Sequence, residues 1–203
     1  AILETTPKIP SPGVLPHLPA ALRGTDFLLK GVAMLRDIKK SGIPHYKGVS
    51  GLRAIGDTQV TGVEARCGDK PLSFAADMLL MHFGVIPETH IYRLLGCHME
   101  WNKSQRYWYP ATDQWGRTNI EQIFAAGDGS GVSGALAAEF KGELAGLEVA
   151  CCLGIIPQYE RDELAAPIQR QLRKDGYPRP LIDAVFAPDP KQFEFDDATV
   201  LCR

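Results

Sequence analysis

The sequence contains no apolar run long enough to cross a membrane. Its longest apolar stretches, residues 78–85 and 144–156, are short or interrupted by Glu and Gly, whereas a bilayer-spanning helix needs about 20 consecutive apolar residues. The chain also lacks the basic segment followed by an apolar segment that opens a secretory signal. We therefore expect no membrane span and a cytoplasmic protein.

An excess of positive charge is missing as well. The 22 basic and 24 acidic residues give a net charge of −2 and are spread through the chain. Because nucleic-acid-binding proteins gather Lys and Arg into a patch that neutralises phosphates, this distribution argues against a nucleic-acid partner. With 203 residues, 45% of them hydrophobic, the chain can still bury a sizeable core.

The cysteines form neither a Cys-x-x-Cys pair nor a metal-ligand spacing. Their odd number argues against a secreted disulfide framework, and the histidines add no carboxylate or cysteine at a metal-binding spacing. We expect buried, reduced thiols and no metal site. The five cysteines are Cys67, Cys97, Cys151, Cys152 and Cys202.

Patterns near the start of the chain predict a strand, a helix and a small antiparallel sheet. Residues 1–6 are apolar and β-branched and precede a proline-rich loop, which predicts a short strand. Apolar residues recur at helical spacing over residues 20–41 and stop at Gly42 and Pro44, as expected for a helix. Three runs separated by Gly-Asp turns then predict antiparallel strands at residues 46–55, 59–67 and 72–75.

The rest of the chain predicts buried strands followed by helices. Residues 77–83 are nearly all apolar, which predicts a strand buried on both faces in a parallel sheet, with His82 inside the core or near a cofactor. Residues 120–126 predict a second buried strand. A short helix near residues 88–95 and two strands within residues 98–109 are expected between them. Further helices are expected at residues 135–153, at 158–174 and near 181–186.

A glycine-rich turn, Gly-Asp-Gly-Ser-Gly at residues 127–131, follows the second buried strand and precedes a helix. Such a turn presents backbone N–H groups and the positive end of the helix dipole to an anion or a polarised oxygen. The carboxylate of Asp128 can accept hydrogen bonds from ligand hydroxyl groups. The alternative is a flexible turn in which Asp128 only caps the following helix.

Residues 118–134 (TNIEQIFAAGDGSGVSG) are similar to the second FAD motif of the glutathione-reductase-like flavoprotein superfamily, in which the acid binds the ribityl chain of the flavin. Residues 77–87 resemble the strand by which these proteins return to the FAD domain, and its Gly-x-x-Pro end lies near the cofactor. The resemblance implies FAD as cofactor. It implies cofactor contacts from Thr118, Gly127, Asp128, Gly131, Val132, Ser133, Gly84 and Pro87.

Trp101, Trp108 and residues 127–135 further resemble the larger subunits of opine dehydrogenases, hydrogen cyanide synthase and dye-linked proline or hydroxyproline dehydrogenases. This resemblance implies an amino-acid-like substrate of opine, proline or glycine type. Its C–N bond would be oxidised by hydride transfer to flavin, and the partner would be a second oxidoreductase subunit. In that group a [2Fe–2S] cysteine cluster begins with Cys-Arg-Cys. Because the chain ends in Leu-Cys-Arg, a cluster is expected beyond Arg203.

The resemblance covers nearly the whole chain and implies a partial α/β fold of the glutathione-reductase-like FAD/NAD(P)-binding type. This fold would contain parallel-sheet strands, a small antiparallel sheet and C-terminal helices. We expect residues 1–76 to be the remainder of a pyridine-nucleotide-binding domain, 77–156 the C-terminal half of the FAD domain, and 157–203 a helical segment leading to a tail. NAD(P) is a second expected cofactor, since Glu4 resembles the acid that meets an adenosine ribose. An exposed strand-end acid is the alternative for Glu4.

The family's two Gly-x-Gly-x-x-Gly fingerprints, each of which belongs to the first βαβ unit of a nucleotide-binding domain, are not found here; the string with this spacing at residues 129–134 belongs to the second FAD motif. Because the first βαβ unit holds the pyrophosphate of FAD, we interpret the chain as a C-terminal fragment and leave open whether it binds FAD alone. A non-catalytic assembly subunit that docks a catalytic partner is the main alternative function. An NAD(P)H-linked disulfide or ferredoxin reductase is disfavoured, because no redox cysteine pair is present. No catalytic acid or base is identified.

Overall fold

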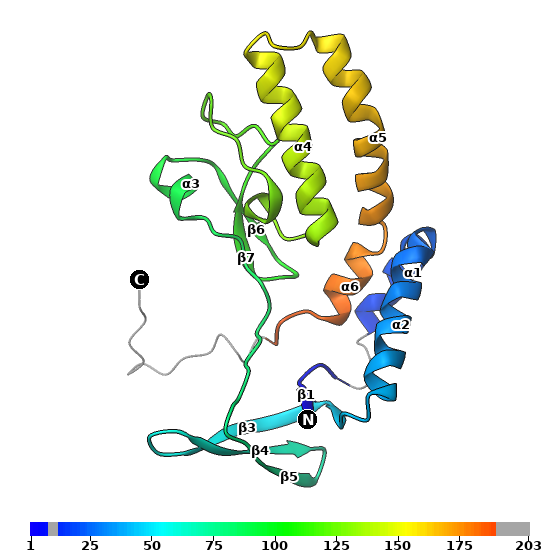
Figure 1. The fold of residues 1–203 in the computed structure, drawn as a ribbon, viewed down its shortest axis with the longest axis vertical. Helices are drawn as coiled ribbons and strands as arrows, with labels where there is room; N and C mark the ends of the chain where they lie inside the picture. The colour runs from blue at the N-terminus through cyan, green and yellow to red at the C-terminus, as the bar shows by residue number, and fades with distance from the viewer. Residues whose placement is uncertain (8–11, 190–203) are drawn as a thin grey trace. The chain divides into compact units, whose positions relative to one another are not determined.

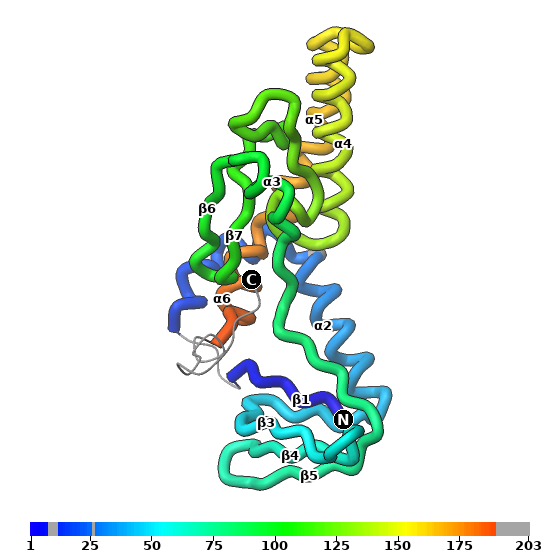
Figure 2. Tube along the Cα trace, turned by 90° about the vertical axis from the view of Figure 1, so that its left-hand side faces the viewer, coloured from blue at the N-terminus to red at the C-terminus, as the bar shows by residue number. Residues whose placement is uncertain are grey.

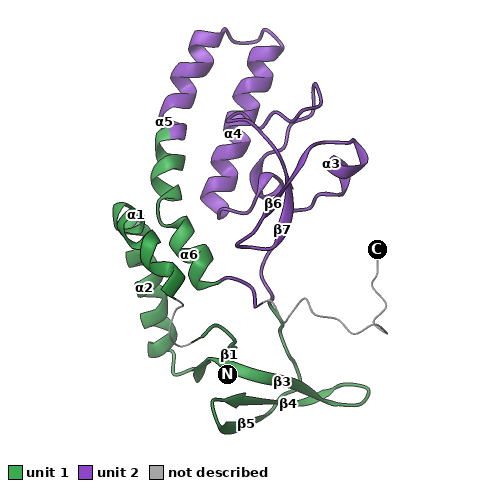
Figure 3. Ribbon diagram, turned by 180° about the vertical axis from the view of Figure 1, so that it is seen from behind, with its two compact units in different colours: residues 1–82, 170–186 green, residues 83–169, 187–203 purple. Residues whose placement is uncertain are grey.

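The protein is described by a computed structural model, which covers residues 1–7 and 12–189. The chain divides into two compact units, one formed by residues 1–82 and 170–186 and the other by residues 83–169 and the chain after residue 186 (Figure 3). Each unit is described by itself. Within the described residues no helix is both long and apolar enough to cross a bilayer.

The first unit begins with two parallel strands, between which the chain forms a helical segment (blue in Figure 1). β1 (Ile2–Glu4) pairs with β2 (His45–Lys47), which confirms the strand predicted at residues 1–6. The helix predicted at residues 20–41 is also confirmed, although a short 3-10 turn interrupts its beginning. The helical elements between the two strands are η1 (Pro12–His17), α1 (Leu18–Ala21), η2 (Leu22–Gly24) and α2 (Thr25–Lys40).

The three predicted antiparallel strands form one sheet in the order β3–β4–β5. Val49, Val63 and Ala65 provide its buried side chains. The first turn depends on Gly56, where φ is +140° and an added Cβ would lie 1.9 Å from the carbonyl oxygen of Gln59. The strands are β3 (Val49–Gly56), β4 (Val60–Cys67) and β5 (Lys70–Ala75).

The second unit contains a two-stranded antiparallel hairpin followed by a glycine loop and long helices. The predicted short helix, the two strands and the later helices are all confirmed. Figures 1 and 2 show the beginning of α5 beside the end of α4. Residues of α5 after 169 belong to the first unit, as does α6. The elements are α3 (His90–Leu94), β6 (Met99–Asn102), β7 (Tyr107–Pro110), η3 (Gly127–Ser130), α4 (Ala135–Cys152), α5 (Gln158–Gly176) and α6 (Arg179–Val185).

The buried strand predicted at residues 77–83 is wrong. The chain between β5 and α3 has no regular secondary structure and is drawn as plain coil in Figure 1. Most side chains of residues 77–83 are exposed, with Leu80 at 86% and Met78 at 71%, and His82 is exposed rather than in a core. A strand needs a hydrogen-bonded neighbour, and none of the described residues pairs with this segment. Apolar composition alone therefore did not produce a strand here.

The strand predicted at residues 120–126 is also wrong. This stretch forms turns and a single antiparallel bridge between Arg117 and Phe124. The hydroxyl of Thr118 donates to the carbonyl oxygens of Ile120 and Ile123 at 3.2 and 2.9 Å, which folds the chain back on itself. One residue near the end of the segment is nevertheless buried, since Ala125 is 1% exposed.

The cysteines within the described residues are free thiols, but their burial differs from the prediction. Only Cys97 is buried, whereas Cys152 is exposed at the end of α4. Cys202 and the expected cluster beyond Arg203 lie outside the described residues. No group of three or more His, Cys, Asp or Glu side chains in the described part of the chain could hold a metal ion.

Candidate functional site

The glycine loop, defined here as residues 127–134, connects the turn region to α4. It begins with η3 and then extends to the first residue of α4. Gly127, Gly131 and Gly134 have φ values of +61°, +110° and +103°. L side chains rarely adopt this left-handed region. The three glycines are therefore required by the path of the backbone.

Side chains from two other elements fasten the glycine loop. The carbonyl oxygen of Gly131 accepts a hydrogen bond from Nζ of Lys141 at 2.7 Å. The next N–H, that of Val132, donates to the hydroxyl of Tyr107 on β7 at 3.1 Å. Ser130 adds a bond within the loop, from its hydroxyl to the carbonyl oxygen of Gly127 at 2.9 Å. The loop thus has a defined shape rather than that of a flexible turn.

Asp128 does not cap the following helix. The N-cap of α4 is Gly134, and no side chain makes a capping bond there. The carboxylate of Asp128 is exposed and makes no hydrogen bond to any residue that the structure describes. The capping alternative is therefore wrong, and the carboxylate is available to accept hydrogen bonds from a ligand.

The beginning of α4 offers donors to a ligand. The first N–H groups of a helix have no partner inside the helix, and no side chain caps this end. No acidic residue lies in the first turn of the 18-residue helix, so the partial positive charge of the dipole is not neutralised there. This end of α4 favours a negatively charged or polarised oxygen.

Thr118 has a role inside the chain. Besides donating its hydroxyl to two carbonyl groups, it accepts a hydrogen bond from the N–H of Ile120 at 3.2 Å. The side chain closes the turn that leads toward the glycine loop. Its expected contact with a cofactor stays a prediction.

Gly84 and Pro87, expected near the same cofactor, lie at the end of the exposed segment. Gly84 has a φ of +102° and is exposed, whereas Pro87 is buried. Among the described residues no hydrogen bond joins Gly84 to the glycine loop. That Gly84 and Pro87 form one cofactor site with the glycine loop therefore stays a prediction.

Comparisons with known proteins agree with the resemblance carried by the glycine loop. Residues 30–145 match the sequence model of the family described as "Pyridine nucleotide-disulphide oxidoreductase". The match covers more than half of the chain and includes the whole glycine loop. The chain belongs to this pyridine nucleotide-disulphide oxidoreductase family. The family resemblance predicted from residues 118–134 is thereby confirmed.

Similar curated proteins carry the names of oxidoreductase subunits. The chain is 34% identical to an opine oxidase subunit of Rhizobium meliloti over 206 residues, which covers 100% of this chain and 38% of the relative. It is 32% identical to the corresponding opine oxidase subunit of Agrobacterium tumefaciens (strain Ach5), covering 100% of this chain and 40% of the relative. A match of 28% identity to "Hydrogen cyanide synthase subunit HcnB" of Pseudomonas aeruginosa covers 64% of this chain and 30% of that protein. The chain thus spans about two fifths of the opine oxidase subunits.

Glu4, the acid expected to contact an adenosine ribose, lies at the end of β1. Its carboxylate lies 2.8 Å from Nε2 of His45 and 3.5 Å from Nζ of Lys47. The side chain is 20% exposed, so the alternative of an exposed strand-end acid is wrong. The expected contact with an adenosine ribose stays a prediction, and a ribose would meet a carboxylate that already has two partners.

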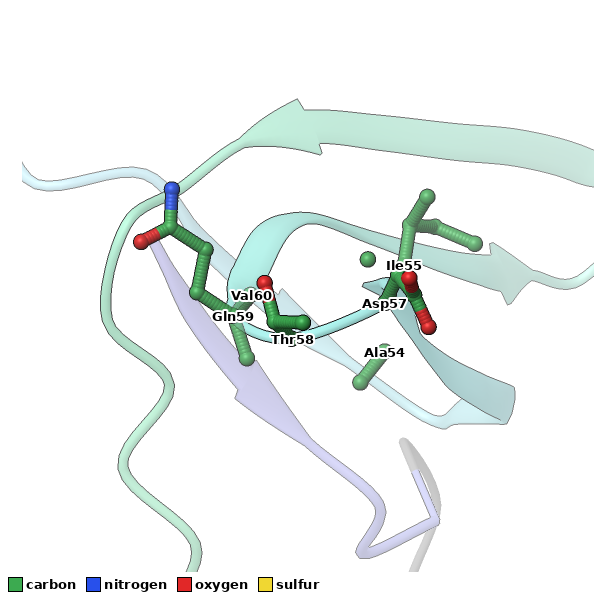
Figure 4. Close-up of a pocket in the computed structure, with 7 residues that line it drawn as sticks. Ala54, Ile55, Asp57, Thr58, Gln59 and Val60 are labelled. Atoms are coloured by element: carbon green, nitrogen blue, oxygen red, sulfur yellow. The ribbon is translucent and has the colours of Figure 1, made fainter.

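A shallow hollow lies within the first unit, at a hairpin turn. It has a volume of about 280 Å³ and lies at the β3–β4 turn, lined by residues 54–60 (Figure 4). All of its lining residues are consecutive in sequence, and none is among the residues that the resemblance implies. The hollow is therefore a product of the hairpin turn, and we assign it no cofactor.

A buried carboxylate near the C-terminal end of α4 was missed by sequence reasoning. Glu148 of α4 is 1% exposed and binds Nε of Arg117 at 2.7 Å and Nη1 of Arg161 at 2.5 Å. The guanidinium of Arg161 also lies 4.2 Å from the ring centroid of Trp115. This network joins the turn region, α4 and the beginning of α5. Glu148 and Arg161 lie beyond the residues of the family match, which end at 145, whereas Arg117 and Trp115 lie within them.

Sequence reasoning also missed Lys141 and the role of Tyr107. Among the aromatic residues between 98 and 115, Tyr107 and Trp115 are buried at 6% and 8% exposure, whereas Trp101 and Trp108 are exposed. Nothing in the pattern showed that the hydroxyl of Tyr107 would meet the glycine loop. Lys141 could have been noticed as a basic residue two turns after the start of a helix that begins with glycines.

Proposed function

We propose that this chain forms the C-terminal part of an FAD-dependent oxidoreductase subunit that oxidises a C–N bond of an amino-acid-like substrate. The observation that carries the proposal is the glycine loop, with a free carboxylate at Asp128 next to an uncapped helix N-terminus. These groups fit a flavin: a carboxylate accepts hydrogen bonds from hydroxyl groups such as those of a ribityl chain, and a helix N-terminus favours negative charge at a ring edge. The names of the relatives support an opine-like substrate, and the proposed class also includes proline-like and glycine-like substrates.

The residues of this chain would bind and orient the cofactor. A bound flavin would supply the hydride acceptor for oxidation of the substrate C–N bond, in which the substrate loses a hydride from carbon and a proton from nitrogen and the resulting imine would be hydrolysed by water. Asp128 would hold the ribityl chain, and Gly127 would let the backbone approach it. Gly131, Val132 and Ser133 would shape the loop at the ring edge. Thr118, Gly84 and Pro87 complete the proposed contacts.

The N–H of Val132 already donates to Tyr107, so the donors that would face the ring edge are those at the beginning of α4. They would favour the reduced form of the flavin because it carries additional negative charge. Residues 1–76 would be the remainder of a pyridine-nucleotide-binding domain, 77–156 the C-terminal half of the FAD domain, and 157–203 a helical segment leading to a tail. NAD(P) would be a second cofactor. The proposed partner is a second oxidoreductase subunit, since the relatives are named as subunits.

The test is the visible spectrum of the full-length gene product, purified with any subunit that co-purifies. A flavin absorption band is expected. A complex without flavin would overturn the proposal and favour the non-catalytic assembly subunit. Consumption of an opine, proline or glycine under anaerobic conditions should bleach the band if the substrate class is right.

Asp128→Ala should weaken flavin retention about 10- to 100-fold, because hydrogen bonds to a charged group contribute about 1.5–3 kcal/mol. Retention is measured as the dissociation constant for FAD in the full-length protein. Glu121→Ala is the matched control, since Glu121 is an exposed carboxylate of the same unit that binds no described residue. Equal retention by both variants would remove Asp128 from the flavin site.

A further inference from the structure

One peptide unit of the glycine loop is fixed at both of its ends. The carbonyl of Gly131 points to Lys141 and the N–H of Val132 points to Tyr107, at 2.7 and 3.1 Å. In a trans peptide these two groups point in opposite directions, so the two contacts together determine the rotation of the peptide plane. A bond from an ammonium group is stronger than one between neutral groups. Lys141 is therefore the stronger of the two constraints.

The same ammonium group reaches a second part of the loop. Nζ of Lys141 lies 3.3 Å from the hydroxyl oxygen of Ser133, which itself donates to the carbonyl oxygen of Gly131 at 3.4 Å. Gly131 and Gly134, which bracket Val132 and Ser133, both have left-handed φ values. Glycine backbones resist rotation poorly. The loop shape thus depends on the tether that Lys141 provides.

The tether also adds charge where the helix dipole is already positive. The first turn of α4 contains no acidic residue. Glu139 and Glu143, the acids of α4 that flank Lys141 in sequence, are exposed and make no hydrogen bond to a described residue. The ammonium group of Lys141 and the uncapped N-terminus of α4 therefore both contribute positive electrostatic potential at the glycine loop. Both stabilise negative charge on a ligand there.

We propose that Lys141 is a positioning residue that holds the glycine loop in its ligand-ready shape and makes the loop prefer the reduced flavin over the oxidised one. The inference rests on the proposed function, because it concerns the same cofactor. It goes beyond that function by assigning the redox preference of the site to one side chain. That side chain acts through the loop and is assigned no contact with the flavin.

The test compares Lys141→Met with the wild-type full-length protein in complex with any co-purifying subunit. Two quantities are measured: the dissociation constant for oxidised FAD and the midpoint potential of the bound flavin. Removing the charge should lower the preference for reduced flavin about tenfold, which for a two-electron couple is a shift of about 30 mV to lower potential. Amide exchange in residues 131–134 should become faster.

Lys141→Arg and Lys103→Met are the matched variants. Arg keeps the charge and a donor, so the potential should return to the wild-type value. Lys103 is an exposed lysine of the same unit, and its loss should leave the potential unchanged. If Lys141→Met fails to fold, Lys141→Gln, which keeps a donor without the charge, should show the same shift in potential. An unchanged potential in a folded, flavin-loaded Met or Gln variant would overturn the role of Lys141 alone, whereas a wild-type complex without flavin would overturn the proposed function.

Discussion

Replacing Glu148 with Ala should destabilise the second unit by about 3 kcal/mol or more, because removing one partner of a buried ion pair leaves the other charges uncompensated. Glu148 is 1% exposed, and its carboxylate binds Arg117 and Arg161 from two other parts of the unit. Arg161 is itself only 11% exposed in its side chain. Loss of the acid would therefore leave a mostly buried guanidinium without one of its two anions, although it would retain Asp162 at 2.6 Å.

The contribution of Glu148 should depend on pH. Burial alone raises the pKa of this carboxyl, but the hydrogen bonds and charges of Arg117 and Arg161 outweigh burial and hold the pKa below its ordinary value of 4.5. A carboxyl whose pKa is lower in the folded state binds fewer protons there than in the unfolded state. Its stabilisation is therefore present above pH 4.5 and is lost as the pH falls through the lowered pKa.

The measurement is native-state hydrogen exchange of the α4 amides in the full-length protein, which reports the free energy of opening this region. Glu148→Gln should show a smaller loss of protection than Glu148→Ala, and its difference from wild type should shrink below pH 4.5. Glu143→Ala is the matched control, because Glu143 lies on the same helix and is exposed. Equal effects of Glu148→Ala and Glu143→Ala would show that the ion-pair network does not stabilise the unit.

Elements whose signals are local could be predicted from the sequence. The helix at residues 20–41 ends next to Gly42, whose φ of +71° only glycine adopts readily. The antiparallel strands follow one another through short turns, so their pairing needs no distant partner. The glycine loop could be predicted because its glycines are visible in the sequence, and three of them adopt the left-handed backbone that glycine allows.

Features that depend on distant residues could not be predicted. The segment 77–83 has the composition of a buried strand, yet a strand forms only where another strand donates to it, and the sequence does not say which one does. Glu148 looks like an ordinary acid within an apolar helix. Its partners are 31 and 13 residues away, and only the fold brings them to it. Likewise Tyr107 meets the N–H of Val132 across 25 residues.

The turn region that carries the chain into the glycine loop should be as sensitive to substitution as the Glu148 network, and Gly116→Ala tests this. The φ of Gly116 is +82°, and an added Cβ would lie 2.6 Å from the carbonyl oxygen of Ala125. The two residues are also joined by a bond from the N–H of Ala125 to the carbonyl oxygen of Gly116 at 2.8 Å. Because the clash is with backbone and Ala125 is 1% exposed, it cannot be relieved by rotating a side chain.

Gly116→Ala should therefore cost about 2–4 kcal/mol, of which about 1–2 kcal/mol comes from the left-handed backbone alone. Gly142→Ala, in α4, separates this cause from a general intolerance of alanine. An added Cβ at Gly142 would meet nothing within 4 Å, and alanine should stabilise the helix by about 0.5–1 kcal/mol. The free energy of unfolding of both variants, measured by denaturant titration of the full-length protein, should move in opposite directions. If Gly116→Ala is neutral, the close approach to Ala125 does not constrain the turn, and the position of the glycine loop must be fixed by Lys141 and Tyr107.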